Sequence, residues 1–157
     1  MGPTLAKAIG DLSLRMRVLR ARQESQSKPG SLSERETIIL DFLREKGKMR
    51  ISEIDASLPE VGISTTSTAI SKLWRNKYVT KSINPKNQRE VFVELTEKGA
   101  NTIATYNKHK EERFKVLFEA MDVSEDEKEV FLRVLNRAIK YIDERLISRN
   151  NRQQGVP

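Results

Sequence analysis

The residues best equipped for chemistry in this chain are hydroxyls and cations gathered between Gly62 and Gly99. From Gly62 to Arg89 there is no Asp or Glu, and the basic residues are Lys72, Arg75, Lys77, Lys81, Lys86 and Arg89. Ser and Thr residues are frequent in the same interval. A surface with one sign of charge and many hydroxyls suits contact with a phosphate backbone. The stretch therefore predicts a nucleic-acid surface.

Composition excludes most other kinds of chemistry. The chain has 157 residues, a formal net charge of +7, no cysteine and one histidine, His109. Disulfides, thiol-based redox sensing and Cys-ligated metal centres are therefore excluded, and so is a His-rich metal site. We find no phosphate-binding glycine loop and no cluster of acidic metal ligands, so the sequence predicts no enzyme, no cofactor and no metal.

The chain shows no sign of a membrane partner. No apolar run approaches the roughly 20 residues that a membrane span requires. The N-terminus also lacks an uninterrupted apolar core ahead of a small-residue cleavage site, so a secretory signal is not predicted. A cytoplasmic location is the expectation.

The first element that would position the basic stretch is a helix from Thr4 to about Gln23. Its apolar residues follow heptad spacing: Leu5, Ile9, Leu12, Met16 and Leu19. Such a stripe predicts packing against other helices or against a symmetry mate. An ordinary amphipathic core helix would show the same pattern. A polar linker ending in Pro29-Gly30 follows.

Two further helices lead to the basic stretch. Ser33-x-x-Glu36 is a capping-box pattern ahead of an apolar helix that is expected to lie at the centre of the domain and to end at Gly47. The next helix spans Arg50 to Leu58 and is stopped by Pro59. After a tight turn through Gly62, Ser64 is expected to cap a helix over residues 64–76. Two helices joined in this way are a helix-turn-helix pattern.

A helical wheel divides the helix at 64–76 into two sides. The side predicted to face the core holds Thr66, Ala69, Ile70, Leu73 and Trp74. The opposite side holds Ser64, Thr65, Thr68, Ser71, Lys72 and Arg75. Its short hydroxyls can bond phosphates or base edges, and its two cations can contact phosphates or guanine. Solvated helix faces usually mix Glu with Lys, so the absence of acids favours DNA contact.

A β-hairpin is predicted directly after this helix. Tyr78–Ile83 and Val91–Leu95 are β-rich runs with alternating apolar residues. The polar loop between them, residues 84–90, is expected to be too long for a two-residue hairpin turn. Lys86 and Arg89 lie near its tip. A hairpin with a basic tip after a recognition helix is the pattern of a winged helix.

The wing residues carry a family resemblance. The segment Asn87-x-Arg89, five residues, Leu95-Thr96-x-x-Gly99 resembles the wing signature of the MarR family of transcription regulators, in which the first position is Asp. Four of the five signature residues match at the right spacing. With the helix-turn-helix and the long flanking helices, the resemblance spans about Leu5 to Leu146.

The resemblance implies roles for the individual wing residues. It implies that Arg89 reaches into the DNA minor groove while helix 64–76 enters the major groove. Asn87 in place of Asp offers only neutral hydrogen bonds, which are roughly half as strong, so a more mobile wing tip is expected. Thr96 is expected to cap the following helix. Gly99, which costs about 1 kcal/mol of helix propensity, is expected to mark close packing.

The fold class expected from these elements is mainly α with a small β-hairpin wing. Residues 1–30 are interpreted as an N-terminal dimerisation helix and linker, and residues 31–99 as a winged helix-turn-helix lobe. Residues 100–147 would complete the dimerisation lobe with two long helices, the second capped by Ser124-x-x-Glu127. The tail, residues 148–157, is expected to be disordered.

The function expected from the resemblance is that of a homodimeric regulator, with repression as the expected mode. A two-fold dimer would read double-stranded DNA at a pseudo-palindromic operator. The family also implies a small aromatic or anionic effector in a cleft between the lobes. Tyr106, His109 and Trp74 are the aromatic candidates, although each is more simply a core or surface residue. The alternative is a winged-helix protein-interaction module that does not bind DNA.

Overall fold

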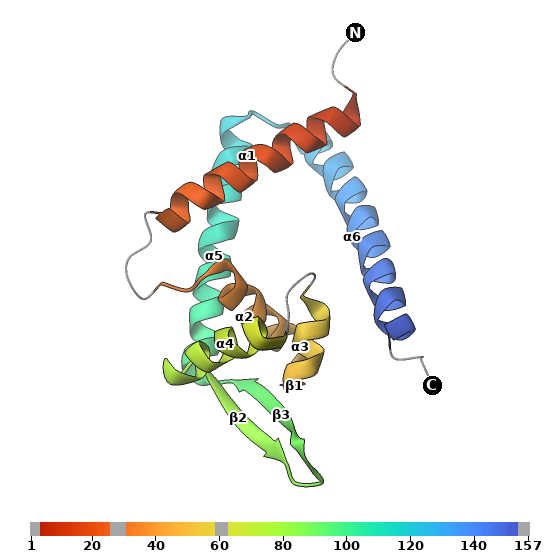
Figure 1. Ribbon diagram of the computed structural model, residues 1–157. Helices are drawn as coiled ribbons and strands as arrows, with labels where there is room; N and C mark the ends of the chain where they lie inside the picture. Colours follow the sequence, from red (N-terminus) through yellow and green to blue (C-terminus); the bar gives the residue numbers. More distant parts are fainter. Residues whose placement is uncertain (1–3, 26–30, 59–62, 154–157) are drawn as a thin grey trace.

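The computed structural model describes residues 4–25, 31–58 and 63–153. In chain order the elements are α1 (Leu5–Ser25), α2 (Glu34–Lys46), β1 (Met49–Arg50), α3 (Ile51–Ser57), α4 (Ile63–Arg75), β2 (Val79–Asn84), β3 (Asn87–Leu95), α5 (Glu97–Ala120) and α6 (Glu125–Gln153). The expected class, mainly α with a small hairpin wing, is confirmed (Figure 1).

The core lies where α2, α3, α4 and the sheet meet at one end of the molecule. Its buried apolar side chains are Ile39, Leu40, Leu43, Met49, Ile54, Leu58, Ile70, Leu73, Val79, Val93 and Ile103. The central place predicted for α2 is confirmed. So are its two ends: Ser33 and Glu36 form the capping box, and Gly47 ends the helix at a φ of 74°.

The sheet has three antiparallel strands in the order β1-β3-β2. The sequence did not predict β1, which is only two residues long and pairs Met49 with Val93. Such a short strand has no periodicity of its own; its pairing depends on the turn at Gly47 that brings it against β3. The long hairpin of β2 and β3 projects from the body as a wing (Figure 1).

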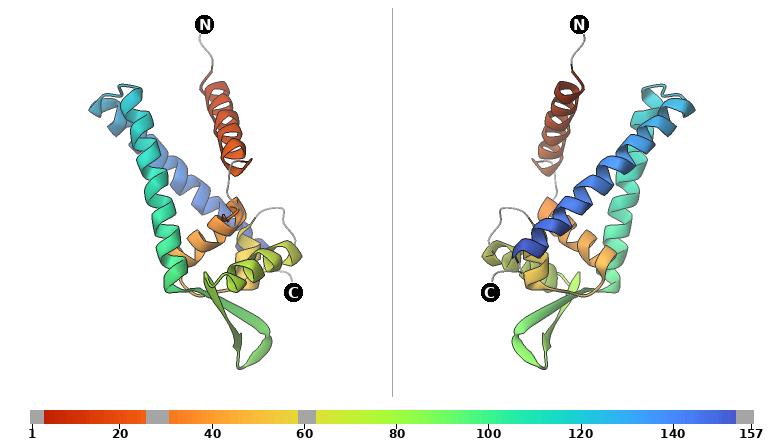
Figure 2. Two further views of the ribbon diagram at one scale, coloured as in Figure 1. Left: turned by 90° about the vertical axis from the view of Figure 1, so that its left-hand side faces the viewer. Right: turned by 90° about the vertical axis from the view of Figure 1, so that its right-hand side faces the viewer.

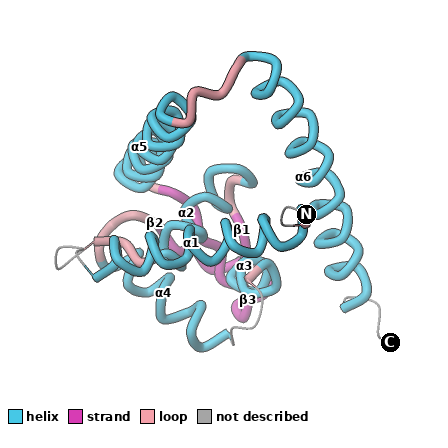
Figure 3. The backbone as a smooth tube through the Cα atoms, turned by 90° about the horizontal axis from the view of Figure 1, so that it is seen from above, coloured by secondary structure: helices cyan, strands magenta, loops and turns pink. Residues whose placement is uncertain are grey.

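The three long helices form the other end of the molecule. From the winged helix, α5 runs away to a sharp turn, and α6 returns so that the two make a V that opens toward the winged helix (Figures 1 and 2). Seen from above, α5 and α6 lie on opposite sides of the molecule (Figure 3). Ser124 caps α6 through Glu127, as predicted. No helix among the described residues is long and apolar enough to cross a membrane.

These helices leave large apolar side chains uncovered. The exposed ones include Leu5, Ile9, Leu12 and Leu19 of α1, Leu117 of α5 and Met121 at its C-cap, and Val130, Phe131, Val134, Leu135 and Ile142 of α6. The only ring–ring contact within the described residues joins Phe118 to Phe131 at 5.9 Å between centroids, across the α5–α6 turn. Apolar surface of this extent usually marks an interaction site.

Two boundaries differ from the expectation. The prediction that Ser64 caps α4 is wrong, because α4 begins at Ile63 and Ser64 lies within its first turn. The predicted disorder from Ser148 is wrong as far as Gln153, because α6 continues through that residue. Adding residues to an existing helix costs far less than starting one, so a polar sequence can extend α6. The predicted turn at 59–62, the linker at 26–30 and residues 154–157 lie outside the described residues.

Candidate nucleic-acid interface

The inner side of α4 is fixed to the core. Thr66, Ile70 and Leu73 are buried, as the wheel predicted, and Ala69 is half-buried. The Thr66 hydroxyl donates to Asp55 Oδ1 on α3 at 2.6 Å, and the side chain is fully covered. This hydrogen bond joins the two helices of the helix-turn-helix, and its Thr66 end is shielded from solvent.

The outward side of α4 presents hydroxyls and one guanidinium. Ser64, Thr65, Thr68 and Arg75 are all exposed. The Thr68 hydroxyl donates to the Ser64 carbonyl at 2.8 Å, which leaves its oxygen free to accept. Within the described residues, the Arg75 side chain has no hydrogen-bonding or ionic partner, so its donors are available to a phosphate or a base edge.

One flank of α4 is tied to α2. Lys72 Nζ lies 2.9 Å from Glu36 Oε1 and 3.3 Å from Glu36 Oε2. The Glu36 side chain is 3 % exposed, whereas that of Lys72 is 45 % exposed. Lys72 is therefore on the predicted side of α4 but turned toward the protein, with its charge balanced by a buried carboxylate.

The other flank of α4 is tied to β2. Lys81 Nζ donates to Ser71 Oγ at 3.1 Å and lies 5.4 Å from the centre of the Trp74 ring. The prediction that Trp74 belongs to the core is wrong, since the residue is 51 % exposed. It lies about a quarter-turn from the line of buried residues, at the margin of the apolar side, where Lys81 covers one ring face.

The junction of α4 and β2 explains the Leu-Thr-x-x-Gly pattern. Lys77 turns the chain with a φ of 62°. Thr96 Oγ1 donates to the Lys77 carbonyl at 2.7 Å and accepts from Gly99 N at 3.0 Å, so it caps α5 as predicted. A Cβ on Gly99 would lie 2.0 Å from the Tyr78 carbonyl oxygen. The expected close packing at Gly99 is confirmed, and it fixes α5 against the base of the wing.

The wing tip is tighter than the sequence predicted. Strands β2 and β3 pair up to Asn84 and Asn87, so only Pro85 and Lys86 form the turn. The predicted long loop is wrong because residues 88–90 are taken up as a bulge in β3, between the Ile83–Val91 pair and the Asn84–Asn87 pair.

The two asparagines at the tip bond to the backbone. Asn84 Oδ1 accepts from Lys86 N at 3.0 Å, and Asn87 Oδ1 accepts from Arg89 N at 3.2 Å. Lys86 and Arg89 are exposed, and neither side chain has a partner among the described residues. Asn87 thus shapes the bulge that presents Arg89, with an amide oxygen where the family pattern has a carboxylate.

The carboxylate that braces the wing is that of Glu90, rather than a carboxylate at position 87. Glu90 Oε2 accepts from Asn84 Nδ2 at 2.6 Å, and Glu90 Oε1 accepts from Arg50 Nη1 at 2.9 Å. Arg50 also pairs with Glu53 on α3 at 2.9 Å. The hydrogen bonds from Asn84 and then Arg50 lower the pKa of Glu90, and those from Arg50 lower the pKa of Glu53. Hydrogen bonds to Glu53 and then Glu90 raise the pKa of Arg50. The brace therefore joins the wing to the helix-turn-helix with all three groups ionised.

The predicted contact residues thus divide into groups. Ser64, Thr65, Thr68 and Arg75 share the outward side of α4, and Lys86 and Arg89 lie at the wing tip, whereas Ser71 and Lys72 are half-buried and engaged by Lys81 and Glu36. Their role toward DNA stays a prediction. Sequence reasoning missed the positioning residues Glu36, Arg50 and Glu90. The spacing Arg50-x-x-Glu53 resembles a capping box and could have drawn attention to Arg50.

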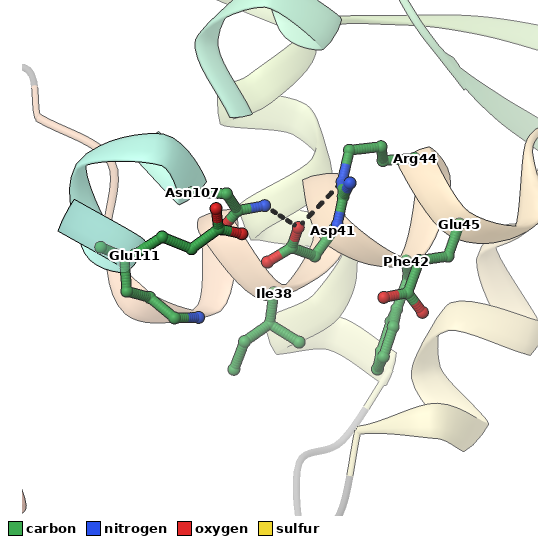
Figure 4. Close-up of a pocket in the computed structure, with 8 residues that line it drawn as sticks. Ile38, Asp41, Phe42, Arg44, Glu45, Asn107 and Glu111 are labelled. Carbon is green, nitrogen blue, oxygen red and sulfur yellow. Dashed lines mark hydrogen bonds and ion pairs between the residues drawn. The ribbon is translucent and has the colours of Figure 1, made fainter. Parts of the chain in front are cut away.

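A shallow cavity of about 360 Å³ lies between α2 and α5 (Figure 4). Its lining residues are Ile38, Asp41, Phe42, Arg44, Glu45, Asn107, Lys110 and Glu111. Asp41 Oδ1 accepts from Asn107 Nδ2 at 2.6 Å and from Arg44 Nε at 3.3 Å, which ties the two helices together. The three aromatic candidates for an effector site, Tyr106, His109 and Trp74, do not line it.

Comparison with known proteins supports this description. Residues 32–99 match the family model of the winged helix DNA-binding domain. The fold is similar to that of a MarR protein from Peptoclostridium difficile (TM-score 0.66, 19 % identity, covering 94 % of this chain and 93 % of that one). No curated protein matches the chain.

Two further structures show bound or regulated states. FabT from Streptococcus pneumoniae, solved in complex with DNA, has a TM-score of 0.69 at 17 % identity, over 90 % of this chain and 99 % of that one. BpsR from Bordetella bronchiseptica, whose DNA binding is regulated by 6-hydroxynicotinic acid, has a TM-score of 0.60 at 20 % identity, over 83 % and 98 %. At these identities the likeness shows the fold, and residues 32–99 form its winged-helix domain.

Proposed function

We propose that this chain, a winged-helix protein with the fold of the MarR regulators, is a homodimeric transcription regulator that binds double-stranded DNA, most simply as a repressor. In this proposal α4 enters the major groove and the wing tip enters the adjacent minor groove. The role is one of binding, with no catalytic step, and the cytoplasm is its proposed location. Residues 1–30 and 100–147 form the dimerisation lobe, and residues 31–99 the DNA-binding lobe.

One observation carries the proposal. Among the described residues, Arg75 at the end of α4, Lys77 directly after it, and Lys86 and Arg89 at the wing tip are exposed cations of the acid-free stretch whose side chains have no partner. The exposed hydroxyls of Ser64 and Thr68 share the helical phase of Arg75. Glu36 and Glu90, which approach α4 and the wing tip, are both paired with cations, and Asp55 accepts from the Thr66 hydroxyl. A protein-interaction module would instead be expected to expose acids or a broad apolar face there.

The uncovered apolar surface supports the proposed dimer. Val134 and Leu135 of α6 and Leu12 of α1 are each about half exposed, on helices that pack little against the core. A second copy would cover them, and two-fold symmetry would present two α4 helices to half-sites about one helical turn apart. A pseudo-palindromic operator is therefore proposed.

A small-molecule effector belongs to the proposal as well. The cavity between α2 and α5 lies where the DNA-binding lobe meets the long helices, and Ile38 and Phe42 give it an apolar part. Its lining carries three carboxylates and two cations, so an aromatic molecule suits it better than an anion. We expect neutral aromatic compounds to release labelled DNA from the wild-type protein. A Phe42→Lys variant should still bind DNA but should not release it when the same compounds are added.

A fluorescence-anisotropy titration tests DNA binding directly. The probes are a duplex carrying the promoter next to the protein's own gene and a mixed-sequence duplex of the same length. We expect tighter binding to the promoter and an affinity that falls steeply with salt for both, because each neutralised phosphate contributes a slope of about −0.9 in log K against log[salt]. Weak binding that does not change between low and moderate salt would contradict the proposal.

A further inference from the structure

Lys72 is the cation of α4 whose surroundings differ from those of a phosphate contact. Given the proposed DNA-binding function, on which this inference rests, we infer that Lys72 is a positioning residue. Through Glu36 it fixes the orientation of α4 about its own axis, and it contributes no net charge to the DNA contact. The unpaired cations, among them Arg75, Lys86 and Arg89, then carry the electrostatic part of binding.

The burial of Glu36 is the first step of the argument. Glu36 is the only acidic residue among the buried side chains of the described chain, with 3 % of its side chain exposed. Glutamates are almost never covered to this degree unless paired. Its Oε2 accepts from Ser33 N at 2.9 Å, and Lys72 Nζ lies within 3.3 Å of both carboxylate oxygens. Lys72 supplies the counter-charge.

The pair should persist when DNA binds. If Lys72 moved to a phosphate, Glu36 would remain as a covered carboxylate with a single backbone donor. Leaving one charge of a buried pair uncompensated is strongly destabilising, whereas a solvent-exposed ion pair returns little. The exchange is therefore unfavourable, even though the Lys72 side chain is 45 % exposed.

The position of the pair explains what it does for α4. On the wheel, Lys72 is about a sixth of a turn from Arg75 on the side toward α2, and Ser71 is on the side toward β2. Lys72 holds the first flank through Glu36, and Lys81 holds the second through Ser71 and Trp74. The strip between them contains Ser64, Thr68 and Arg75, so the two ties determine which side chains face outward.

The pair also joins the start of α2 to the recognition helix. Glu36 is at once the capping-box residue of α2 and the partner of Lys72. A displacement of the first turn of α2 would therefore move the counter-charge of Lys72. Glu36 therefore helps to position α4, although its own helix, α2, makes no DNA contact in the proposal.

Salt dependence separates a positioning role from a phosphate contact. Anisotropy titrations of the full-length protein against a labelled mixed-sequence duplex would compare Lys72→Met, Arg75→Met and Glu36→Gln. We expect Lys72→Met to weaken binding several-fold with an unchanged salt slope, and Arg75→Met to flatten the slope by about 0.9 for each phosphate that is no longer neutralised. Glu36→Gln should make the slope steeper, because it frees the Lys72 charge. A merely structural role would not produce that change.

Stability measurements show whether a change in DNA binding comes with a loss of folding stability. The denaturation midpoint should fall for Lys72→Met, which strands the Glu36 charge, and recover in the double variant Glu36→Gln/Lys72→Met, which removes both charges. Lys72→Arg should keep the pair and bind DNA like the wild type. Lys115→Met, at an exposed position of α5 away from the cavity, is the matched control for loss of one lysine.

Two outcomes would overturn the inference, and they are distinguishable. If Lys72→Met flattens the slope as much as Arg75→Met while the wild type binds normally, Lys72 is a phosphate contact and only this inference fails. If the wild type itself shows no salt-dependent binding, the proposed function fails and the inference fails with it.

Discussion

Because Gly99 has no Cβ, α5 can pack directly against the backbone of Tyr78. The Gly99 Cα lies so close to the chain at Tyr78 that the carbonyl oxygen occupies the place of a side chain. The same carbonyl accepts from Thr96 N at 3.1 Å. The position thus tolerates only glycine, despite the cost of glycine in a helix.

We expect Gly99→Ala to destabilise the protein by about 1–3 kcal/mol, because overpacking outweighs the gain in helix propensity. Denaturant unfolding would measure the difference. Gly10→Ala is the matched control, since no atom lies within 4 Å of its added Cβ and the residue is off the apolar stripe of α1. Equal stability of the Gly99→Ala variant and the wild type would disprove the close contact.

Arg89 is the residue on which the wing's proposed role depends. We expect Arg89→Ala to weaken DNA binding about tenfold or more and to reduce the salt slope by about one for each protomer, while dimerisation is unaffected. Anisotropy and sizing chromatography would show this. Arg113→Ala removes the same charge from the exposed middle of α5 and should change neither. Unchanged DNA affinity in Arg89→Ala would exclude the minor-groove role.

At the scale of elements, the wing is oriented by side chains outside its tip. Arg50 comes from β1 and the start of α3, and its bond to Glu90 crosses to the wing. The family pattern has its carboxylate at position 87, where this chain has Asn87. Glu90 takes over the ionic contact three residues later, so the expected mobility of the tip is opposed by the brace.

The ionisation of Glu90 gives this brace a testable pH dependence. Because the pKa of Glu90 is lowered in the fold, the brace is complete at neutral pH and at pH values above about 4.3, the ordinary glutamate value. It is lost only as the pH falls through the lowered folded value. Carboxyl NMR titration should show Glu90 titrating below the ordinary glutamate value, since its pKa is lowered.

Removing Arg50 should separate its contribution from that of Asn84. We expect Arg50→Met to move the Glu90 titration upward, toward but not up to the ordinary value, because Asn84 still donates. Amide exchange at residues 86–90 should become several-fold faster. Arg44→Met, which removes an arginine bound to Asp41 far from the wing, is the control. A Glu90 titration that does not move would show that Arg50 is not part of the brace.

At the scale of the whole molecule, the exposed apolar stripe of α1 predicts that this helix takes part in the proposed dimer. We expect deletion of residues 1–22 to lower the apparent mass in sizing experiments, because the stripe contributes apolar surface to the proposed dimer. Leu12→Lys should act in the same direction, whereas the neighbouring Ser13→Lys, off the stripe, should not. A truncated dimer as stable as the intact one would contradict an interface role for α1.

Local patterns were enough to predict every element except β1. The capping residues Ser33, Thr96 and Ser124, the helix end at Gly47 and the buried side of α4 all depend on neighbours within four residues in sequence. These contacts form inside one element or at its end, so spacing determines them. The wing pattern was equally local, which is why it could be recognised without a fold.

Only the tertiary structure decided which cations are available. The interval from Gly62 to Arg89 has no acid in sequence, yet Glu36 comes from α2 to neutralise Lys72, and Lys81 turns toward Ser71 and Trp74. The partners are 36 and about ten residues apart, and no local spacing predicts such pairs. The sequence by itself determined a basic, hydroxyl-rich helix and wing. Packing leaves Arg75, Lys77, Lys86 and Arg89 as the cations of this stretch without a partner among the described residues, because charge pairing depends on distance in space rather than along the chain.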